Sequence, residues 1–278
     1  MTDTLLPLTA CPRAALRGIV AVLTDLDDTL TLEGRITAQA LDALERMQAA
    51  GIRTVIVSGR PGGWCDHIAR MWPVDAVVGE NGAFYFRYDR DARKMHRSYA
   101  QTLTERQANR GRLMAVGQRV LREFPGTALA SDQAYREIDV AIDFREDVPP
   151  LPLETADAIR RAFEAEGAIA KVSSIHVNAW FGQHDKLTMA HCCLADCFGL
   201  DSNRDRAAIA YAGDSPNDAP MFAHFPNSFG VANLLPYRLL MQHLPRYVTQ
   251  GDGGRGFAEL TDAILETRHG KIIETAKA

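Results

Sequence analysis

The chain has 278 residues, of which 46% are hydrophobic and 24% charged, the composition of an ordinary globular protein with one large domain or two smaller ones. The formal net charge of −4 argues against a protein that binds nucleic acid by neutralising phosphates. No apolar run approaches the roughly 20 residues that span a bilayer, so we expect no membrane partner.

The N-terminus and the cysteines point to a cytoplasmic protein. The first residues lack the basic start and apolar core of a signal peptide. Cys192, Cys193 and Cys197 fall on one predicted helix, and no second ligand pair at the spacing of a zinc site accompanies them. We therefore expect reduced, buried thiols.

The first motif is the stretch VLTDLDDTLT at residues 22–31, where Asp25, Asp27 and Asp28 fall within four positions. They follow an apolar run at residues 19–23, which predicts a buried strand. Like charges this close repel each other, and burial strengthens the repulsion. A bound cation, or a catalytic task for one of the acids, would account for the arrangement.

Helix and strand then alternate along the chain. Thr37 is a candidate N-cap for a helix that Gly51 can close. Apolar runs at residues 52–57 and 74–79 are expected to form strands that are buried on both faces. Such strands, separated by helices, are typical of a doubly wound parallel sheet.

The pattern changes after Tyr85. Residues 137–144 alternate strictly between apolar and polar side chains, which predicts a strand with one face in solvent, as in an antiparallel sheet. Helices are expected around residues 103–124 and 154–166, and a further strand at 173–181. We therefore predict an α/β fold with a Rossmann-like core of residues 1–83 and 183–278, interrupted by an inserted α+β cap domain of residues 84–182.

Parallel strands are expected again after the insert. A helix should begin at Lys186, and a buried strand at residues 207–213 should end at Asp214. In open parallel sheets, ligands bind beyond the carboxyl ends of the strands. This rule collects polar residues from four strand ends at one edge of the sheet, with Lys186 beside them: Asp25 to Thr29, Ser58, Asn81, and Asp214 to Asp218.

The residue types gathered at this edge suit a metal ion and a phosphoryl group. Asp25, Asp214 and Asp218 offer the carboxylate oxygens that hard divalent cations prefer. Ser58 offers a hydroxyl donor, and Lys186 offers a positive charge. We expect the cation and the phosphoryl group to share the site.

The motifs resemble those of the haloacid dehalogenase superfamily of phosphohydrolases, in particular its Cof-type branch with a C2 (type IIB) cap, which includes sugar-phosphate phosphatases and phosphomannomutases. The DxDxT motif of the family matches residues 25–29, and its second motif matches VSGR around Ser58. The third matches HDKLTM around Lys186, and the fourth matches GDSPND at residues 213–218. Four motifs in this order cover nearly the whole chain.

The resemblance implies a Mg²⁺-dependent phosphatase that hydrolyses a small phosphorylated metabolite, such as a sugar phosphate, through an aspartyl-phosphate. Asp25 would be the nucleophile and Asp27 the general acid and base, with Thr29 orienting Asp27. The remaining implied contacts are Ser58, Gly59, Lys186 and Asn217 for the phosphoryl group, and Asp25, the backbone carbonyl of Asp27, Asp214 and Asp218 for the metal.

The contacts to the rest of the substrate have competing interpretations. His176, Asn178 and Trp180 alternate along one strand, so they share a face that suits a sugar or, equally, packing of the cap on the core. Arg60 and Arg136 would grip a second anionic group or form surface salt bridges. Asn81 would contact the phosphate or support a turn.

Two other functions compete with the phosphatase. A phosphohexomutase of the phosphomannomutase type would return the phosphoryl group to a second hydroxyl of the substrate. A non-catalytic, receiver-like phospho-binding protein would use a similar Asp, Ser and Lys set. In receiver domains, however, the phosphorylated Asp lies on a later strand and no cap is inserted.

Overall fold

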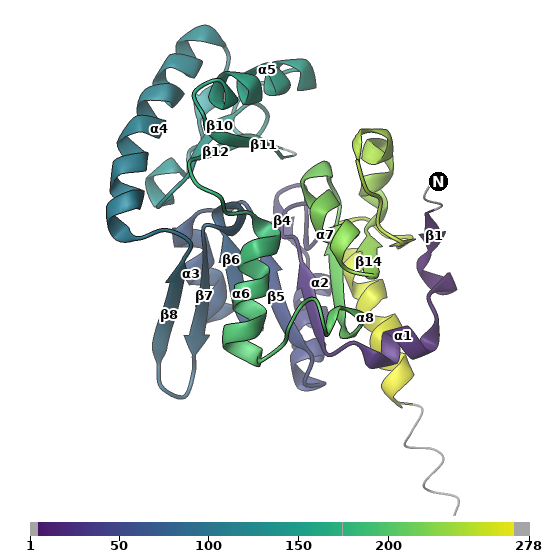
Figure 1. Cartoon of the computed structure of the whole chain (residues 1–278). Coiled ribbons are helices and arrows are strands. Elements are labelled where there is room, and N and C mark those ends of the chain that lie inside the picture. The colour runs from purple at the N-terminus through teal and green to yellow at the C-terminus, as the bar shows by residue number, and fades with distance from the viewer. Residues whose placement is uncertain (1–4, 174, 270–278) are drawn as a thin grey trace, which may run out of the picture.

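The computed structural model describes residues 5–173 and 175–269, and its centre is a nine-stranded sheet (Figure 1). Seven neighbouring strands, from β1 at one edge across to β6, pair in parallel. The hairpin of β7 and β8 extends the sheet beyond β6 in antiparallel fashion. In spatial order the strands are β1 (Leu6–Pro7), β15 (Tyr247–Val248), β14 (Asn227–Gly230), β13 (Ile209–Gly213), β2 (Ala21–Thr24), β5 (Arg53–Val57), β6 (Ala76–Gly79), β7 (Phe84–Asp89) and β8 (Lys94–Tyr99).

Helices cover both faces of this sheet, which confirms the predicted doubly wound α/β core. Strand β2 shows why the strands are apolar throughout, since Val22 packs into the core on one face and Leu23 into the core on the other. The first face is covered by α1 (Arg13–Gly18), α2 (Ala38–Ala49), α3 (Gly62–Met71) and α8 (Gly253–His269), and the second by α6 (Lys186–Phe198) and α7 (Ala219–His224).

The helix ends follow the chemistry expected from the sequence. The Thr37 hydroxyl accepts a hydrogen bond from the Ala40 N–H at 3.1 Å and caps α2. Gly51 has a φ of +71° just after the end of this helix, a conformation that costs glycine little. Among the described residues, no helix combines the length and the apolar character needed to cross a bilayer.

The insert forms a second layer above the carboxyl ends of the core strands (Figure 1). Its four strands are all antiparallel, and two helices pack on the outer face of this sheet. The other face, which carries His176 and Asn178, is turned toward the core. The elements are α4 (Leu103–Glu123) and α5 (Leu153–Glu164), with strands in the spatial order β11 (Ile169–Val172), β12 (His176–Trp180), β10 (Val140–Asp143) and β9 (Ala128–Leu129).

Residues 84–99, expected in the insert, instead pair with the core sheet as the hairpin β7–β8. A tight turn at residues 80–82, with positive φ at all three positions, reverses the chain after β6. Phe84 and Phe86 then pack into the core on one face of the large sheet. The division of the strands between the two sheets therefore begins the insert near residue 100 rather than at 84.

The expected solvent-facing side of the strand at residues 137–144 is also a wrong prediction. Asp139 and Asp143 are only 2% and 1% exposed. Their face of β10 is turned toward the core rather than toward water, and backbone N–H groups or arginine bind both carboxylates. A polar strand face can be buried when a second domain supplies its partners.

The two chain crossings between core and insert lie side by side. The Gln101 side chain, where the chain enters the insert, donates a hydrogen bond to the carbonyl of Phe181, where it leaves. The Ala100 N–H donates to the Ala83 carbonyl at 2.9 Å, which holds the entering segment on the core. The chain therefore enters and leaves the insert at one place on the core.

Candidate active site

The acidic motif lies where two neighbouring parallel strands end. Asp25 follows β2, and its N–H donates to the Ala212 carbonyl of β13 at 2.9 Å, which extends the ladder by one residue. Asp214 follows β13, so the sheet itself brings the two acids together. Both are buried, with exposed fractions of 5% for Asp25 and 2% for Asp214.

Asp25, Asp214 and Asp218 form a buried cluster whose carboxylate oxygens lie within 4.8 Å of one another. The Lys186 ammonium is 3.1 Å from Asp25 Oδ1 and 3.0 Å from Asp218 Oδ1. Burial raises the pKa of Asp25 to about 7, although Lys186 pulls it down. Burial and repulsion from Asp218 and Asp25 also raise the pKa of Asp214 well above its ordinary value. One lysine does not balance three carboxylates, so this donor set fits a hard divalent cation.

Asp218 is the most constrained of the three acids, with no exposed surface. Its Oδ2 accepts the N–H groups of Asp214 and Ser215 at 3.1 and 3.2 Å. Its Oδ1 accepts from Lys186 and from the Tyr211 hydroxyl. Both oxygens therefore shape the loop and hold the lysine, which favours a supporting position beside the cation over a direct bond to it.

Thr29 has a partner other than the one expected. The Thr29 hydroxyl donates to Asp214 Oδ1 at 2.9 Å, so it holds Asp214 rather than Asp27. Asn217 lies beside it, and its Oδ1 accepts from the Ser215 hydroxyl at 2.7 Å. The Asn217 side chain lines the cleft between core and insert.

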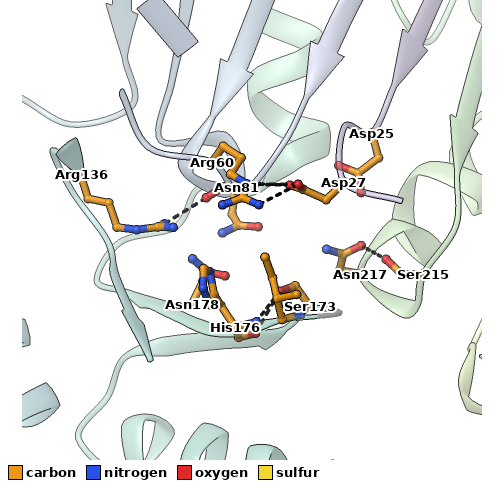
Figure 2. A pocket seen from close by; sticks show the side chains of 12 residues that line it. Asp25, Asp27, Arg60, Asn81, Arg136, Ser173, His176, Asn178, Ser215 and Asn217 are labelled. Carbon is orange, nitrogen blue, oxygen red and sulfur yellow. Dashed lines mark hydrogen bonds and ion pairs between the residues drawn. The ribbon is translucent and has the colours of Figure 1, made fainter. Parts of the chain in front are cut away.

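The ends of β5 and β6 supply the next part of the site. Ser58 is 1% exposed, and its hydroxyl oxygen accepts the Arg60 N–H at 3.1 Å. A Cβ added at Gly59 would lie 3.2 Å from the Asn81 side chain, so glycine lets the two strand ends approach closely. Asn81 is 5% exposed with a φ of +56°, and its Nδ2 has no hydrogen-bond partner. Its amide points into the cleft (Figure 2).

Arg60 spans the cleft from the core side, and it is 5% exposed rather than a surface residue. Its Nε lies 3.1 Å from both oxygens of Asp27, and its Nη2 lies 3.0 Å from one of them (Figure 2). The ring of Trp64 lies 4.6 Å from the guanidinium carbon. Arg60, and not Thr29, therefore orients the Asp27 carboxylate.

Arg136 holds the insert together and ties it to the core. Its Nε donates to Asp132 at 3.0 Å, and its Nη1 donates to Asp139 at 2.9 Å and to the Gly59 carbonyl at 3.0 Å. Asn178 Nδ2 donates to the other oxygen of Asp139 at 3.1 Å. This buried network replaces the expected surface salt bridge.

Glu80, like Arg136, connects the core with the insert along the boundary between them, which we call the seam. Its buried carboxylate accepts four backbone N–H groups, at 2.7 to 3.0 Å. One donor is Gly62 at the start of α3, and the others are residues 137–139 of the insert. Burial, with repulsion from Asp139, raises the pKa of Glu80 to about 7.

Of the three alternate residues on β12, two face the cleft and the third packs elsewhere. His176 and Asn178 line the cleft. Trp180, expected beside them, does not line it, because its Nε1 donates to the His184 carbonyl at 3.1 Å and its ring stacks on that histidine. The register of the strand put the three residues on one face, but only the first two reach the site.

Sequence reasoning missed Ser173, which lines the cleft, and Glu146, which contacts two residues that line it. Glu146 Oε1 is 2.9 Å from Arg60 Nη2, and its Oε2 is 2.9 Å from His176 Nε2. These two neighbours lower the pKa of Glu146 to about 2, with the His176 contact as the larger effect. One sequence signal for Glu146 was available. Asp143 lies just before a turn, and an aspartate there can fix the loop that follows, which contains Glu146.

The cleft between core and insert is narrow, with a cavity volume of about 20 Å³. Figure 2 shows its two walls, with core residues on one side and insert residues on the other. The walls are formed by Asp25, Asp27, Gly59, Arg60, Asn81, Ser215 and Asn217 from the core, and by Arg136, Ser173, Ile175, His176 and Asn178 from the insert.

Comparison with known proteins agrees with this architecture. Three solved structures share the fold over nearly the whole chain. A Thermoplasma acidophilum protein has a TM-score of 0.66 at 19% identity, covering 89% of this chain and 98% of its own. A haloacid dehalogenase-like hydrolase from Bacteroides thetaiotaomicron has a TM-score of 0.63 at 16% identity, covering 88% and 99%. The sucrose-phosphatase from Synechocystis sp., solved with sucrose and phosphate, has a TM-score of 0.61 at 15% identity, covering 91% and 98%.

Sequence comparison gives one match, and it covers part of the chain. A search of curated proteins found no match. Residues 22–110, which carry the first acidic motif and Ser58, match the sequence profile of the haloacid dehalogenase-like hydrolases. The chain is thus similar in sequence to the haloacid dehalogenase-like hydrolases over this segment, and solved structures share its fold along nearly the whole chain.

Proposed function

We propose that the protein is a Mg²⁺-dependent phosphatase that hydrolyses a small phosphorylated metabolite, with a sugar phosphate as its substrate. One observation carries the proposal. Asp25 lies at the cleft in a buried cluster with Asp214, Asp218 and a single lysine, and Asp27 follows two residues later. A nucleophile, a cation site and a second acid are thus within one small cleft.

The cation would be held by Asp25 and Asp214, with the backbone carbonyl of Asp27 as a further ligand and Asp218 as support. The fit rests on three buried carboxylates with one ammonium group among them, which contacts Asp25 and Asp218 but not Asp214. When bound, Mg²⁺ would neutralise negative charge on the phosphoryl oxygens during transfer. Lys186 would act on the same charge from the other side.

The reaction would proceed in two displacements. A carboxylate oxygen of Asp25 attacks phosphorus, the ester P–O bond breaks, and Asp27 gives its proton to the departing alkoxide oxygen. Asp27 then takes a proton from a water molecule that attacks the aspartyl-phosphate, and the bond from phosphorus to Asp25 breaks. Free phosphate and the alcohol are the products.

Donors around the cleft would bind the phosphoryl group. Ser58 accepts a hydrogen bond from Arg60, so its own hydroxyl proton can point at a phosphoryl oxygen. The amide of Asn81 has no protein partner for its Nδ2. The backbone N–H of Gly59 and the side chain of Asn217 would complete the set, since both residues line the cleft.

The insert would act as a substrate-binding lid over a Rossmann-like catalytic core. Support comes from His176, Asn178 and Ser173, which face the phosphate end of the cleft from the opposite wall (Figure 2). Polar side chains of this kind suit the hydroxyls of a sugar. A lid this close to the nucleophile also excludes a protein chain and bulk water, so the substrate is small.

The test is a screen of a few dozen phosphorylated metabolites for phosphate release, with the full chain in Mg²⁺. We expect activity on sugar phosphates, loss of that activity in EDTA, and recovery when Mg²⁺ is added back. Full activity in EDTA would contradict the metal site. Conversion of a hexose 1-phosphate to its 6-phosphate without free phosphate would show a mutase instead.

A further inference from the structure

Glu146 is placed so that it contacts two side chains of the cleft at once, an arginine and a histidine. It lies 2.9 Å from Arg60 on the core wall and 2.9 Å from His176 on the insert wall. Its loop is fixed, because the buried carboxylate of Asp143 accepts the N–H groups of residues 145, 146 and 147, each at 2.8 Å. The position of Glu146 is therefore built into the insert.

The arginines near the leaving-group end of the cleft are already neutralised. Arg60 is shared between Asp27 and Glu146, with Asp132 at 3.5 Å. Arg136 is bound by Asp132 and Asp139. With Glu80 buried beside this network, carboxylates outnumber guanidinium groups on this side of the cleft. A second anionic group on the substrate would have to displace one of these acids and leave it unpaired.

The groups left to meet the substrate are uncharged. Asn81 Nδ2 has no partner. Asn178, whose Nδ2 donates to Asp139, and Ser173, whose hydroxyl is bonded within its own turn, also line the cleft with uncharged groups. Amides and hydroxyls both donate and accept hydrogen bonds, as alcohol groups require. The polar lining thus matches a polyol, whereas its charges oppose an acid.

We propose that this site selects phosphate esters of uncharged polyols against esters that carry a second anionic group, and that Glu146 sets this selectivity by occupying Arg60 and His176. This inference rests on the proposed phosphatase function. It identifies Glu146 as a residue that determines specificity through charge, not through shape. Without Glu146, Arg60 and His176 would be free to bind a carboxylate of the substrate.

The test compares substrate pairs that differ only in that charge. Glycerol 3-phosphate against 3-phosphoglycerate, and glucitol 6-phosphate against 6-phosphogluconate, each exchange a CH₂OH group for a carboxylate. We expect wild-type kcat/KM to favour the alcohol by about ten-fold or more. In Glu146→Gln, which keeps the size of the side chain, this ratio should fall about ten-fold.

Glu166→Gln is the matched control, since Glu166 is also a glutamate of the insert and pairs with Arg119 at 2.8 Å, but on the surface. It should leave the ratio unchanged. Equal or reversed preference in the wild type overturns the inference, and so does an unchanged ratio in Glu146→Gln.

Failure of the phosphatase proposal itself would look different, because no ester, including p-nitrophenyl phosphate, would then release phosphate. Calorimetric titration of Asp25→Asn in Mg²⁺ with each pair decides the charge inference in that case. Tighter binding of the alcohol supports it. Equal affinity, tighter binding of the acid, or no binding of the alcohol overturns it.

Discussion

On the core wall of the cleft, three buried carboxylates have one lysine among them, which pairs with two of the three. Where the insert meets the core, buried arginines are instead each held by more than one carboxylate. The first arrangement is incomplete without a further cation, and the second is complete as it stands. Unbalanced charge is costly unless a ligand balances it, so it marks the place where chemistry occurs. Balanced charge holds the two parts of the molecule in position.

The largest effect expected from breaking the core wall is that of Asp25→Asn. Asparagine keeps the shape but lacks the attacking oxyanion, so kcat should fall by on the order of 10⁴ or more. Steady-state phosphate release in Mg²⁺ measures it. A variant that retains a tenth of the wild-type rate would remove the covalent mechanism.

Asp27→Asn tests the acid of the core wall that also contacts an arginine of the seam, Arg60. The loss should be roughly 10² to 10⁴ for an alkyl phosphate, whose leaving group needs a proton. It should be smaller for p-nitrophenyl phosphate, whose leaving group does not. Equal losses on both substrates would argue against a general-acid role.

Arg136→Ala tests whether the insert network is structural. It leaves Asp132 and Asp139 buried without their cation, so the free energy of unfolding should fall by about 3–5 kcal/mol in urea titrations. Arg119→Ala, which breaks an exposed pair with Glu166, should cost no more than about 1 kcal/mol. Similar losses in the two variants would show that the buried network does not hold the seam.

Glu80→Gln gives the smallest effect, and it depends on pH. Because the pKa of Glu80 in the folded protein is raised to about 7, the folded state binds the proton more tightly than the unfolded chain does. The stability that this group contributes is therefore complete below its unfolded pKa and is lost as pH rises through about 7. The loss amounts to at most about 1.4 kcal/mol per pH unit.

Urea titrations between pH 5 and pH 7.5 check this prediction. Glutamine resembles the protonated acid, so the variant should gain stability relative to wild type as pH rises. The opposite trend would show that the four N–H donors keep the carboxylate ionised despite its burial, and that Glu80 acts as a charged anchor.

The sequence predicted more of the residues at the acidic site than of the contacts between core and insert. The rule that parallel strands present their carboxyl ends at one edge was enough to bring Asp25, Ser58, Asn81 and Asp214 together. No such rule connects Glu146 with Arg60, because their contact depends on how two separately folded layers meet. A glutamate in a polar loop has the sequence pattern of a solvated residue.

The same reason explains the other misplaced features. Asp139 alternates with apolar residues exactly as a solvent-facing acid would, and only the facing domain buries it. The hairpin at residues 84–99 has no sequence signal that distinguishes the edge of one sheet from the start of another. Thr29 was assigned to Asp27 by family likeness, and the fold placed Asp214 closer to its hydroxyl.

The contact between Gln101 and Phe181 has a consequence for how such a protein can change over evolution. The two ends of the insert touch, so the core sees the insert as a short connection between neighbouring points. The length of the insert therefore adds little to the conformational entropy that the core loses on folding. The core sheet, including the β7–β8 hairpin, is continuous without the insert. The insert can therefore be exchanged, shortened or rebuilt as a unit while the strand ends that carry the acidic cluster stay intact.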